Sequence, residues 1–189
     1  YRTTDGTVIG DWVRSGWGTL TFDRGYAMSS NVAIINIIDR HMNSLMLRQY
    51  FRKLGFGKQT GISLPNESTG VLNFKYETEI FNAGFGQGIT TTPIQNIQAM
   101  TTLTNDGMLL KPYIVEKIID PETNEVILEN SRNEKDRVAS TQTVQKMLQL
   151  MDEAVNGQGV PATGFKIDSG ELIGKTGTAQ IARENGTGY

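Results

Sequence analysis

The chain has 189 residues, of which 38% are hydrophobic and 20% are charged, so it is long and apolar enough to form one domain or most of one. Its 18 basic and 20 acidic residues leave a net charge of −2 without a basic block, which argues against a nucleic-acid partner. Cysteine does not occur and His41 is the only histidine, so we expect neither disulfides nor a transition-metal site.

The ends of the chain predict a segment of a longer protein. Tyr1 opens directly into polar, turn-rich sequence without a signal peptide, and the chain stops abruptly at Tyr189. No stretch approaches the ~20 apolar residues that a membrane-spanning helix needs.

The first third of the chain predicts a loop followed by two helices. Residues 1–25 are rich in Gly, Thr and Asp, which favours loop with short strands. Ser29 or Ser30 can cap a helix over 32–42 that is apolar on nearly every side, so we expect it to be buried centrally. A second helix is expected over 44–54, with an inner face of four residues: Leu45, Tyr50, Phe51 and Leu54.

Further helices and late strands are expected in the rest of the chain. Thr92 and Pro93 begin a third helix, along which apolar residues recur every three positions at Ile94, Ile97, Met100 and Leu103. A hairpin is expected over 113–128, and Ser140 caps a fourth helix with apolar residues at helical spacing. Residues 172–181 predict a strand that a Lys-Thr-Gly turn interrupts. Long helices followed by late strands favour an α+β fold.

Two short motifs have the side chains that acyl transfer by a serine requires. Ser29 and Asn31 lie two positions apart at a helix start, where a turn can present a proton-relaying hydroxyl and a carbonyl-binding amide to one cleft. Helix capping is the plain alternative, and it is the better interpretation of Ser29-Ser30-Asn31 taken alone.

The second motif is Lys175-Thr176-Gly177-Thr178. It combines a cation, a hydroxyl, a glycine that allows close backbone approach, and an N–H that can donate to an oxyanion. A solvent-facing lysine before a tight turn is the alternative. A phosphate-binding loop is a poor interpretation, because that motif needs Gly at 169, where this chain has Ser169.

Taken together, these motifs resemble two of the three active-site elements of penicillin-binding proteins and serine β-lactamases. Phe85-Gly86-Gln87 also resembles the Phe-Gly-Gln stretch that lies between them in class B penicillin-binding proteins. The resemblance covers essentially the whole chain and looks closest to Gram-positive transpeptidases of cell division. It includes further short segments: Asp11-Trp12, Gly16-Trp17-Gly18, residues 56–61, residues 105–107 and Lys111-Pro112.

The resemblance implies an α+β penicillin-binding/serine β-lactamase-like transpeptidase fold, with residues 1–189 forming part of the domain. The third family motif, a nucleophilic Ser with a Lys three residues later, matches no Ser in this chain. We therefore expect an upstream Ser-x-x-Lys segment and the C-terminal strands to be lacking here, and the chain alone to be inactive.

By the same resemblance, the parent protein is expected to be a D,D-transpeptidase that cross-links peptidoglycan stem peptides and is acylated by β-lactams. Ser29, Asn31 and Lys175 would be catalytic, with Lys175 poising the Ser29 hydroxyl. The substrate-binding residues would be Thr176, which binds a carboxylate, Gly177, Thr178, whose N–H is an oxyanion donor, and Gln87.

No cofactor or metal is implied. The expected partners are stem peptides, β-lactams and other cell-wall synthesis proteins, at the extracytoplasmic face of the membrane with the anchor outside this segment. Two alternatives stay open. One is a β-lactam-sensing or otherwise non-catalytic penicillin-binding domain, and the other is a serine β-lactamase or D,D-carboxypeptidase.

Overall fold

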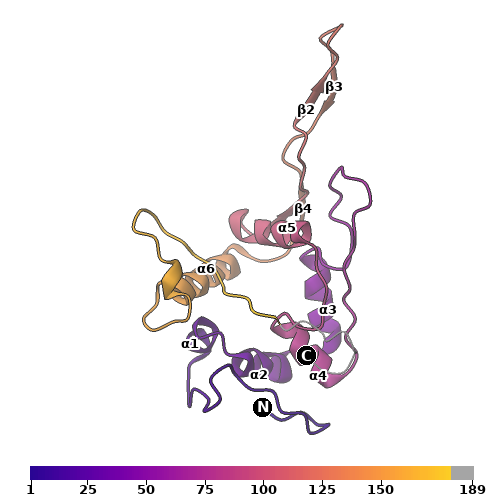
Figure 1. Cartoon of the computed structure of the whole chain (residues 1–189). Helices are drawn as coiled ribbons and strands as arrows, with labels where there is room; N and C mark the ends of the chain where they lie inside the picture. The colour runs from indigo at the N-terminus through magenta and orange to yellow at the C-terminus, as the bar shows by residue number, and fades with distance from the viewer. Residues whose placement is uncertain (180–189) are drawn as a thin grey trace. The chain divides into compact units, whose positions relative to one another are not determined.

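The computed structural model describes residues 1–179, which form two compact units. The first contains Tyr1–Leu47, Asn73–Ile89 and the described chain from Lys146, and the second contains Arg48–Leu72 and Thr90–Gln145. Figure 1 labels the helices α1 (Phe22–Ala27), α2 (Asn31–His41), α3 (Ser44–Lys53), α4 (Glu77–Gly84), α5 (Pro93–Thr104) and α6 (Thr141–Asn156). The strands are β1 (Met108–Leu110), β2 (Lys117–Ile119), β3 (Val126–Glu129) and β4 (Glu134–Arg137), and a 3-10 turn follows at Thr163–Phe165. Helices with short antiparallel strand pairs confirm the expected α+β class.

Helix α1 replaces part of the loop expected over 1–25, so that expectation is wrong for its last four residues. Thr21 caps the helix by accepting the Arg24 N–H at 3.3 Å. Ion pairs then join α1 to α6: Asp23 to Lys146 at 2.6 Å and Arg24 to Glu153 at 3.3 Å. A helix of 6 residues is too short to show a clear period of 3.6, which explains why the pattern did not reveal it.

Helix α2 begins after Ser30, and the expectation that it is buried on nearly every side is wrong. Only Ile35 and Ile38 are buried within it, while its other apolar residues are partly exposed. The helix packs against α4, where Gly84 allows the contact: a Cβ at position 84 would lie 2.0 Å from Ile38 Cδ1. The absence of a side chain at Gly84 therefore sets how closely α2 and α4 approach.

Helix α3 forms where expected, but its predicted inner face is wrong at Leu45 and Tyr50. Leu45 is 62% exposed and Tyr50 is 47% exposed, whereas Leu47 is buried. Residues 47, 51 and 54 share one face of a helix with 3.6 residues per turn, and residues 45 and 50 do not.

Helix α5 has the expected start, with Thr92 and Gln95 forming a reciprocal capping box. Its buried face is polar, because Gln95 and Gln98 are fully buried while Ile97 is 59% exposed. The Gln95 amide donates to the carbonyls of Lys58 and Thr69, both at 2.8 Å, and so ties the preceding loop to the helix.

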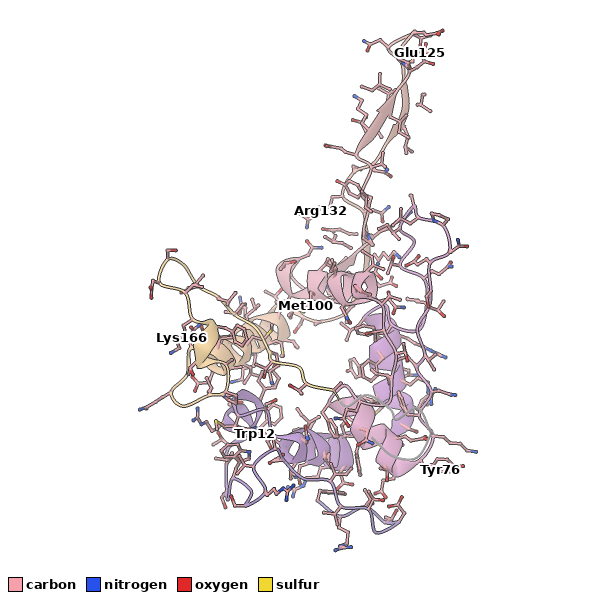
Figure 2. All side chains as sticks on the ribbon, viewed as in Figure 1. Trp12, Tyr76, Met100, Glu125, Arg132 and Lys166 are labelled. Atoms are coloured by element: carbon pink, nitrogen blue, oxygen red, sulfur yellow. The ribbon has the colours of Figure 1, made fainter. Side chains whose placement is uncertain are left out.

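The expected hairpin forms between β2 and β3, with Lys117 opposite Glu129. Asp120 turns the chain by accepting the N–H groups of Glu122 and Thr123 at 2.8 and 3.0 Å. Within the second unit the hairpin extends away from α5 (Figure 1), and Figure 2 shows Glu125 at its tip. The β1–β4 pair was not predicted, since strands of three and four residues leave little pattern to detect.

Helix α6 confirms the prediction from Ser140, whose hydroxyl accepts the Thr143 N–H at 3.2 Å. The strand expected over 172–181 is wrong as far as Ala179, where the chain is irregular. A strand needs a neighbour for its backbone hydrogen bonds, and no strand in the described part of the chain pairs with this segment. Gln180 and Ile181 lie outside the described residues.

Candidate active site

The turn between α1 and α2 separates the roles of two adjacent serines. Ser30 is the N-cap of α2 and accepts the Ala33 N–H at 3.0 Å. Ser29 has a φ of 57°, in the left-handed region that a non-glycine residue rarely adopts. Its N–H donates to the Tyr26 carbonyl at 3.0 Å, which fixes the turn and leaves the Ser29 hydroxyl free of helix capping.

Asp11 secures this turn from the N-terminal loop. Its carboxylate accepts the Ser30 hydroxyl at 2.9 Å and the Val32 N–H at 3.0 Å. A negative charge at a helix N-terminus is favourable, because the first N–H groups lack partners within the helix. In the sequence, Asp11 stands out only as part of the Asp11-Trp12 segment of the family resemblance. Its position in the chain did not indicate a contact with Ser30 or Val32.

The segment that carries Lys175 is held along α6. The Asn156 amide donates to the Leu172 carbonyl at 3.0 Å, and the Gly174 N–H donates to the Met151 carbonyl at 3.4 Å. These hydrogen bonds fix the backbone of residues 172–174 on α6, and so position Lys175, which follows directly.

Lys175 and Ser29 meet. The Lys175 ammonium donates to Ser29 Oγ at 2.7 Å, to the Thr176 carbonyl at 3.2 Å and to Thr176 Oγ1 at 3.3 Å. The first distance lies within the range that proton transfer through a hydrogen bond requires. The structure therefore brings together the hydroxyl of one motif with the cation and hydroxyl of the other.

The electrostatics of this contact are unusual for an exposed lysine. Desolvation at its ammonium lowers the pKa of Lys175 below the ordinary value of 10.5. The ammonium lies 5.7 Å from the centre of the Tyr26 ring, and burial raises the pKa of that tyrosine to about 12. Across residues 1–179, none of the salt bridges includes Lys175, so neutral oxygens and an aromatic ring surround its charge.

Residues 1–189 match the family described as the penicillin binding protein transpeptidase domain. The chain belongs to this family. The match confirms the transpeptidase fold and, with the relatives below, the resemblance to class B penicillin-binding proteins.

Several relatives of this transpeptidase domain are known. The chain is 34% identical over 188 residues to stage V sporulation protein D of Bacillus subtilis (strain 168), covering 97% of this chain and 28% of that protein. It is 33% identical over 144 residues to penicillin-binding protein 2B of Streptococcus pneumoniae (strain D39), covering 71% of this chain and 21% of that protein. A crystal structure of penicillin binding protein 3 from Mycobacterium tuberculosis, complexed with aztreonam, superposes with a TM-score of 0.83 at 28% identity, covering 95% of this chain and 41% of that one. The chain thus spans less than a third of the length of these curated relatives.

The other expected site residues of the domain make no hydrogen bond to the Ser29–Lys175 pair among the described residues. The Asn31 amide donates to the Gly10 carbonyl at 3.2 Å, and the Gln87 backbone N–H donates to the Asn82 carbonyl at 2.8 Å. No hydrogen bond among the described residues joins either side chain to Ser29 or Lys175. Gly177 and Thr178 are exposed, and a Cβ at Gly177 would meet nothing within 4 Å, so a ligand can approach the backbone there.

Residues 1–179 contain no group of three or more His, Cys, Asp or Glu side chains placed to hold a metal ion. None of the helices described is both long and apolar enough to cross a membrane.

Tyr26 is a second residue, after Asp11, whose role the sequence did not reveal. It lies three positions before Ser29 in a helix that the pattern did not reveal, and its ring contacts the ammonium of a residue far along the chain. Its position three residues before the Ser-Ser-Asn motif was the one available signal.

Proposed function

We propose that the protein containing this chain is a peptidoglycan D,D-transpeptidase that cross-links stem peptides by serine acyl transfer and is acylated by β-lactams. The 2.7 Å contact between Lys175 Nζ and Ser29 Oγ carries the proposal, because it places a proton donor on a hydroxyl within a domain of the transpeptidase family.

Ser29 relays a proton to the leaving group during acylation. When the peptide or β-lactam C–N bond breaks, the leaving nitrogen takes the hydroxyl proton of Ser29, and Ser29 Oγ takes a proton from the Lys175 ammonium. The serine of the upstream Ser-x-x-Lys segment forms the new ester bond to the carbonyl carbon and gives its hydroxyl proton to the Lys of that segment. The C–N electron pair ends on the nitrogen with the proton from Ser29, and Lys175 is left neutral. The lowered pKa of Lys175 makes it a stronger acid than an ordinary lysine, which suits this donation.

The relay runs backwards when the acceptor amine attacks the acyl-enzyme. The amine loses a proton to Ser29 Oγ while the Ser29 proton returns to neutral Lys175. The ester C–O bond breaks, and the Lys of the upstream segment returns the proton to the serine oxygen, so the site is reset. The acyl group passes from the serine ester to the amine without a cofactor. Because Lys175 holds its charge with no acidic partner in residues 1–179, the site is positive and favours a substrate carboxylate.

The remaining residues bind the substrate in this proposal. Thr176 Oγ1, held 3.3 Å from Lys175 Nζ, binds the carboxylate of the peptide or β-lactam, and Gly177 leaves room for it. The exposed Thr178 N–H donates to the oxyanion. Asn31 holds a substrate carbonyl and must turn its amide from Gly10 to do so, while Gln87 lies at the rim.

The nucleophile is assigned to a Ser-x-x-Lys segment upstream of Tyr1, and further strands to the chain beyond Tyr189. Residues 1–189 are therefore part of the domain. The protein acts at the extracytoplasmic face of the membrane, with an anchor outside this segment and with other cell-wall synthesis proteins as partners.

The test is acylation and turnover of the full-length protein. We expect fluorescent penicillin to label it stoichiometrically and stably, and a stem-peptide donor with an amine acceptor to give a cross-linked product by mass spectrometry. The 189-residue chain alone is the matched control and should show no added mass. A stable adduct without cross-linking would favour the sensing alternative, and rapid hydrolysis of the adduct would favour a β-lactamase or carboxypeptidase.

A further inference from the structure

Tyr26 touches both ends of the Ser29–Lys175 contact. Its backbone carbonyl accepts the Ser29 N–H at 3.0 Å, and the centre of its ring lies 5.7 Å from Lys175 Nζ. The residue stands on α1, which ion pairs to α6 hold in place, and α6 also anchors the segment that carries Lys175. Tyr26, on a helix that ion pairs hold against α6, thus contacts both partners of the Lys175–Ser29 hydrogen bond, which joins residues 146 positions apart.

The Lys175 ammonium needs such a contact, because it has been partly withdrawn from water without a counter-ion among residues 1–179. Its hydrogen-bond acceptors are the neutral oxygens of Ser29 and Thr176. The negative face of an aromatic ring attracts an ammonium within about 6 Å, and more strongly when water is excluded. The ring supplies attraction to the charged form without neutralising it.

We propose that Tyr26 is a positioning residue that sets the distance between the proton donor and the relay, with its ring seating the Lys175 ammonium and its carbonyl fixing the Ser29 turn. This inference rests on the proposed function. It adds to that function a residue outside the Ser-Ser-Asn and Lys-Thr-Gly motifs.

The aromatic ring of Tyr26, and not its phenol hydroxyl, positions the Lys175 ammonium in this proposal. Burial raises the pKa of Tyr26 to about 12, so the hydroxyl stays neutral over the working range of the site. The charged side chains of the packed elements are engaged elsewhere: Asp23 with Lys146, Arg24 with Glu153, and Asp11 with Ser30 and Val32. The Tyr26 ring is therefore the group through which α1 acts on the ammonium.

Two substitutions in the full-length protein separate the ring from the hydroxyl. Tyr26→Phe keeps the aromatic face, and Tyr26→Leu keeps apolar bulk, helix propensity and the backbone carbonyl but removes that face. Tyr76→Leu is the matched control, because the Tyr76 ring lies 5.5 Å from Lys75 Nζ at an exposed position of the first unit (Figure 2).

We expect Tyr26→Phe and Tyr76→Leu to be acylated by penicillin within about twofold of the wild-type rate. Tyr26→Leu should be acylated about tenfold more slowly, because a tenfold change in rate corresponds to the free energy of a partly desolvated cation–π contact. The pH at which acylation falls on the alkaline side should drop in Tyr26→Leu alone, because burial persists while the attraction for the ammonium is lost. A merely structural role would lower the melting temperature and leave that pH unchanged, and would overturn the proposal. Tyr26→Phe as slow as Tyr26→Leu would also overturn it.

A second measurement does not depend on activity. In NMR spectra the Lys175 ε-CH₂ protons should show the shift caused by a nearby aromatic ring in the wild type and in Tyr26→Phe, and should lose it in Tyr26→Leu. If the wild type takes up no penicillin but shows this shift, the proposed function fails while the contact stands. If the shift is missing from the wild type, the positioning role is wrong.

Discussion

The ammonium of Lys175 donates to the hydroxyl of Ser29 over 2.7 Å, although the two residues are 146 positions apart. The neighbouring Ser30 has a different role, because the Ser30 hydroxyl caps α2 and donates to the Asp11 carboxylate. One serine therefore faces the charge and the other holds the helix.

Substitution of the two serines should separate these tasks. Ser29→Ala should lower penicillin acylation of the full-length protein by ~100-fold or more, the scale of a lost proton relay, with little change in melting temperature. Ser30→Ala should lower the free energy of unfolding by ~1 kcal/mol through loss of the cap, with a much smaller effect on acylation. Acylation kinetics and thermal unfolding of both variants check this. Similar losses of activity and stability in both would contradict separate roles.

The acylation rate should depend on the protonation of Lys175. Because the charged form donates the proton, we expect the rate to fall as pH rises through the pKa of Lys175, with a midpoint below its ordinary value of 10.5. The free energy of unfolding should change with pH in the opposite direction to the acylation rate. The folded state loses this proton more readily than the unfolded state, so the contribution of Lys175 to stability rises with pH between the folded and unfolded pKa values. Acylation rates and unfolding curves from neutral pH upward test both signs, and an acylation rate that climbs across this window would contradict proton donation.

Glu67 should stabilise the second unit above acidic pH. Burial opposes ionisation of its carboxylate, but hydrogen bonds from Thr60 and Gly61, at 2.5 to 3.2 Å, outweigh burial and lower its pKa below 4.5. The stability it contributes is therefore present above pH 4.5 and is lost as pH falls through the lowered pKa. Glu67→Gln should cost ~1 kcal/mol at pH 7, since one carboxylate oxygen becomes an N–H₂ group that cannot accept a hydrogen bond and the remaining neutral oxygen is a weaker acceptor.

Urea unfolding of the domain at pH 7 and near pH 3 measures this difference, which should shrink at the lower pH. Glu122→Gln, at an exposed position in the β2–β3 turn, is the control and should change stability little at either pH. A loss that is equal at both pH values would show that the charge of Glu67 is irrelevant.

Sequence patterns predicted the parts of this molecule that depend on local rules. Caps at Ser30 and Thr92, the hairpin turn at Asp120 and the helix after Ser140 all follow from the preferences of neighbouring residues. The juxtaposition of Ser29 and Lys175 was also expected, but through resemblance of two short motifs, since spacing carries no information across 146 positions.

The structural features that the sequence did not predict depend on tertiary contacts, which local sequence patterns do not encode. The inner face of α5 contains Gln95 and Gln98, because the loop and strand beside them present carbonyls that need donors. An apolar repeat along the same helix pointed to the opposite face. Similarly, residues 172–179 have β-like composition but no neighbouring strand in the described chain, and Tyr26 gains its importance only once the turn at Ser29 is formed.

The buried Gln98 gives a test of that polar face. Its amide donates to the Leu110 carbonyl at 2.9 Å, so Gln98→Leu leaves a carbonyl of β1 without this donor. Gln98 Oε1 is itself buried without a hydrogen-bond partner among the described residues, so its removal offsets part of the cost, and we expect a net loss of ~1 kcal/mol in the free energy of unfolding. Gln145→Leu makes the same chemical change at an exposed position of α6 and should stay within ~0.5 kcal/mol. A stabilised Gln98→Leu variant in chemical denaturation would show that the polar face is not needed.

The central claim is that Ser29 and Lys175 act as one proton relay, and a double-mutant cycle tests it most directly. The second-order rate constant of acylation by penicillin is measured for the full-length wild type, Ser29→Ala, Lys175→Ala and the double variant. Each single change should cost ~100-fold or more, and the double variant should be little slower than the slower single one, because residues that act as a unit are not additive. If the two losses instead multiply in the double variant, or if either single variant is acylated at the wild-type rate, the relay between Ser29 and Lys175 is wrong.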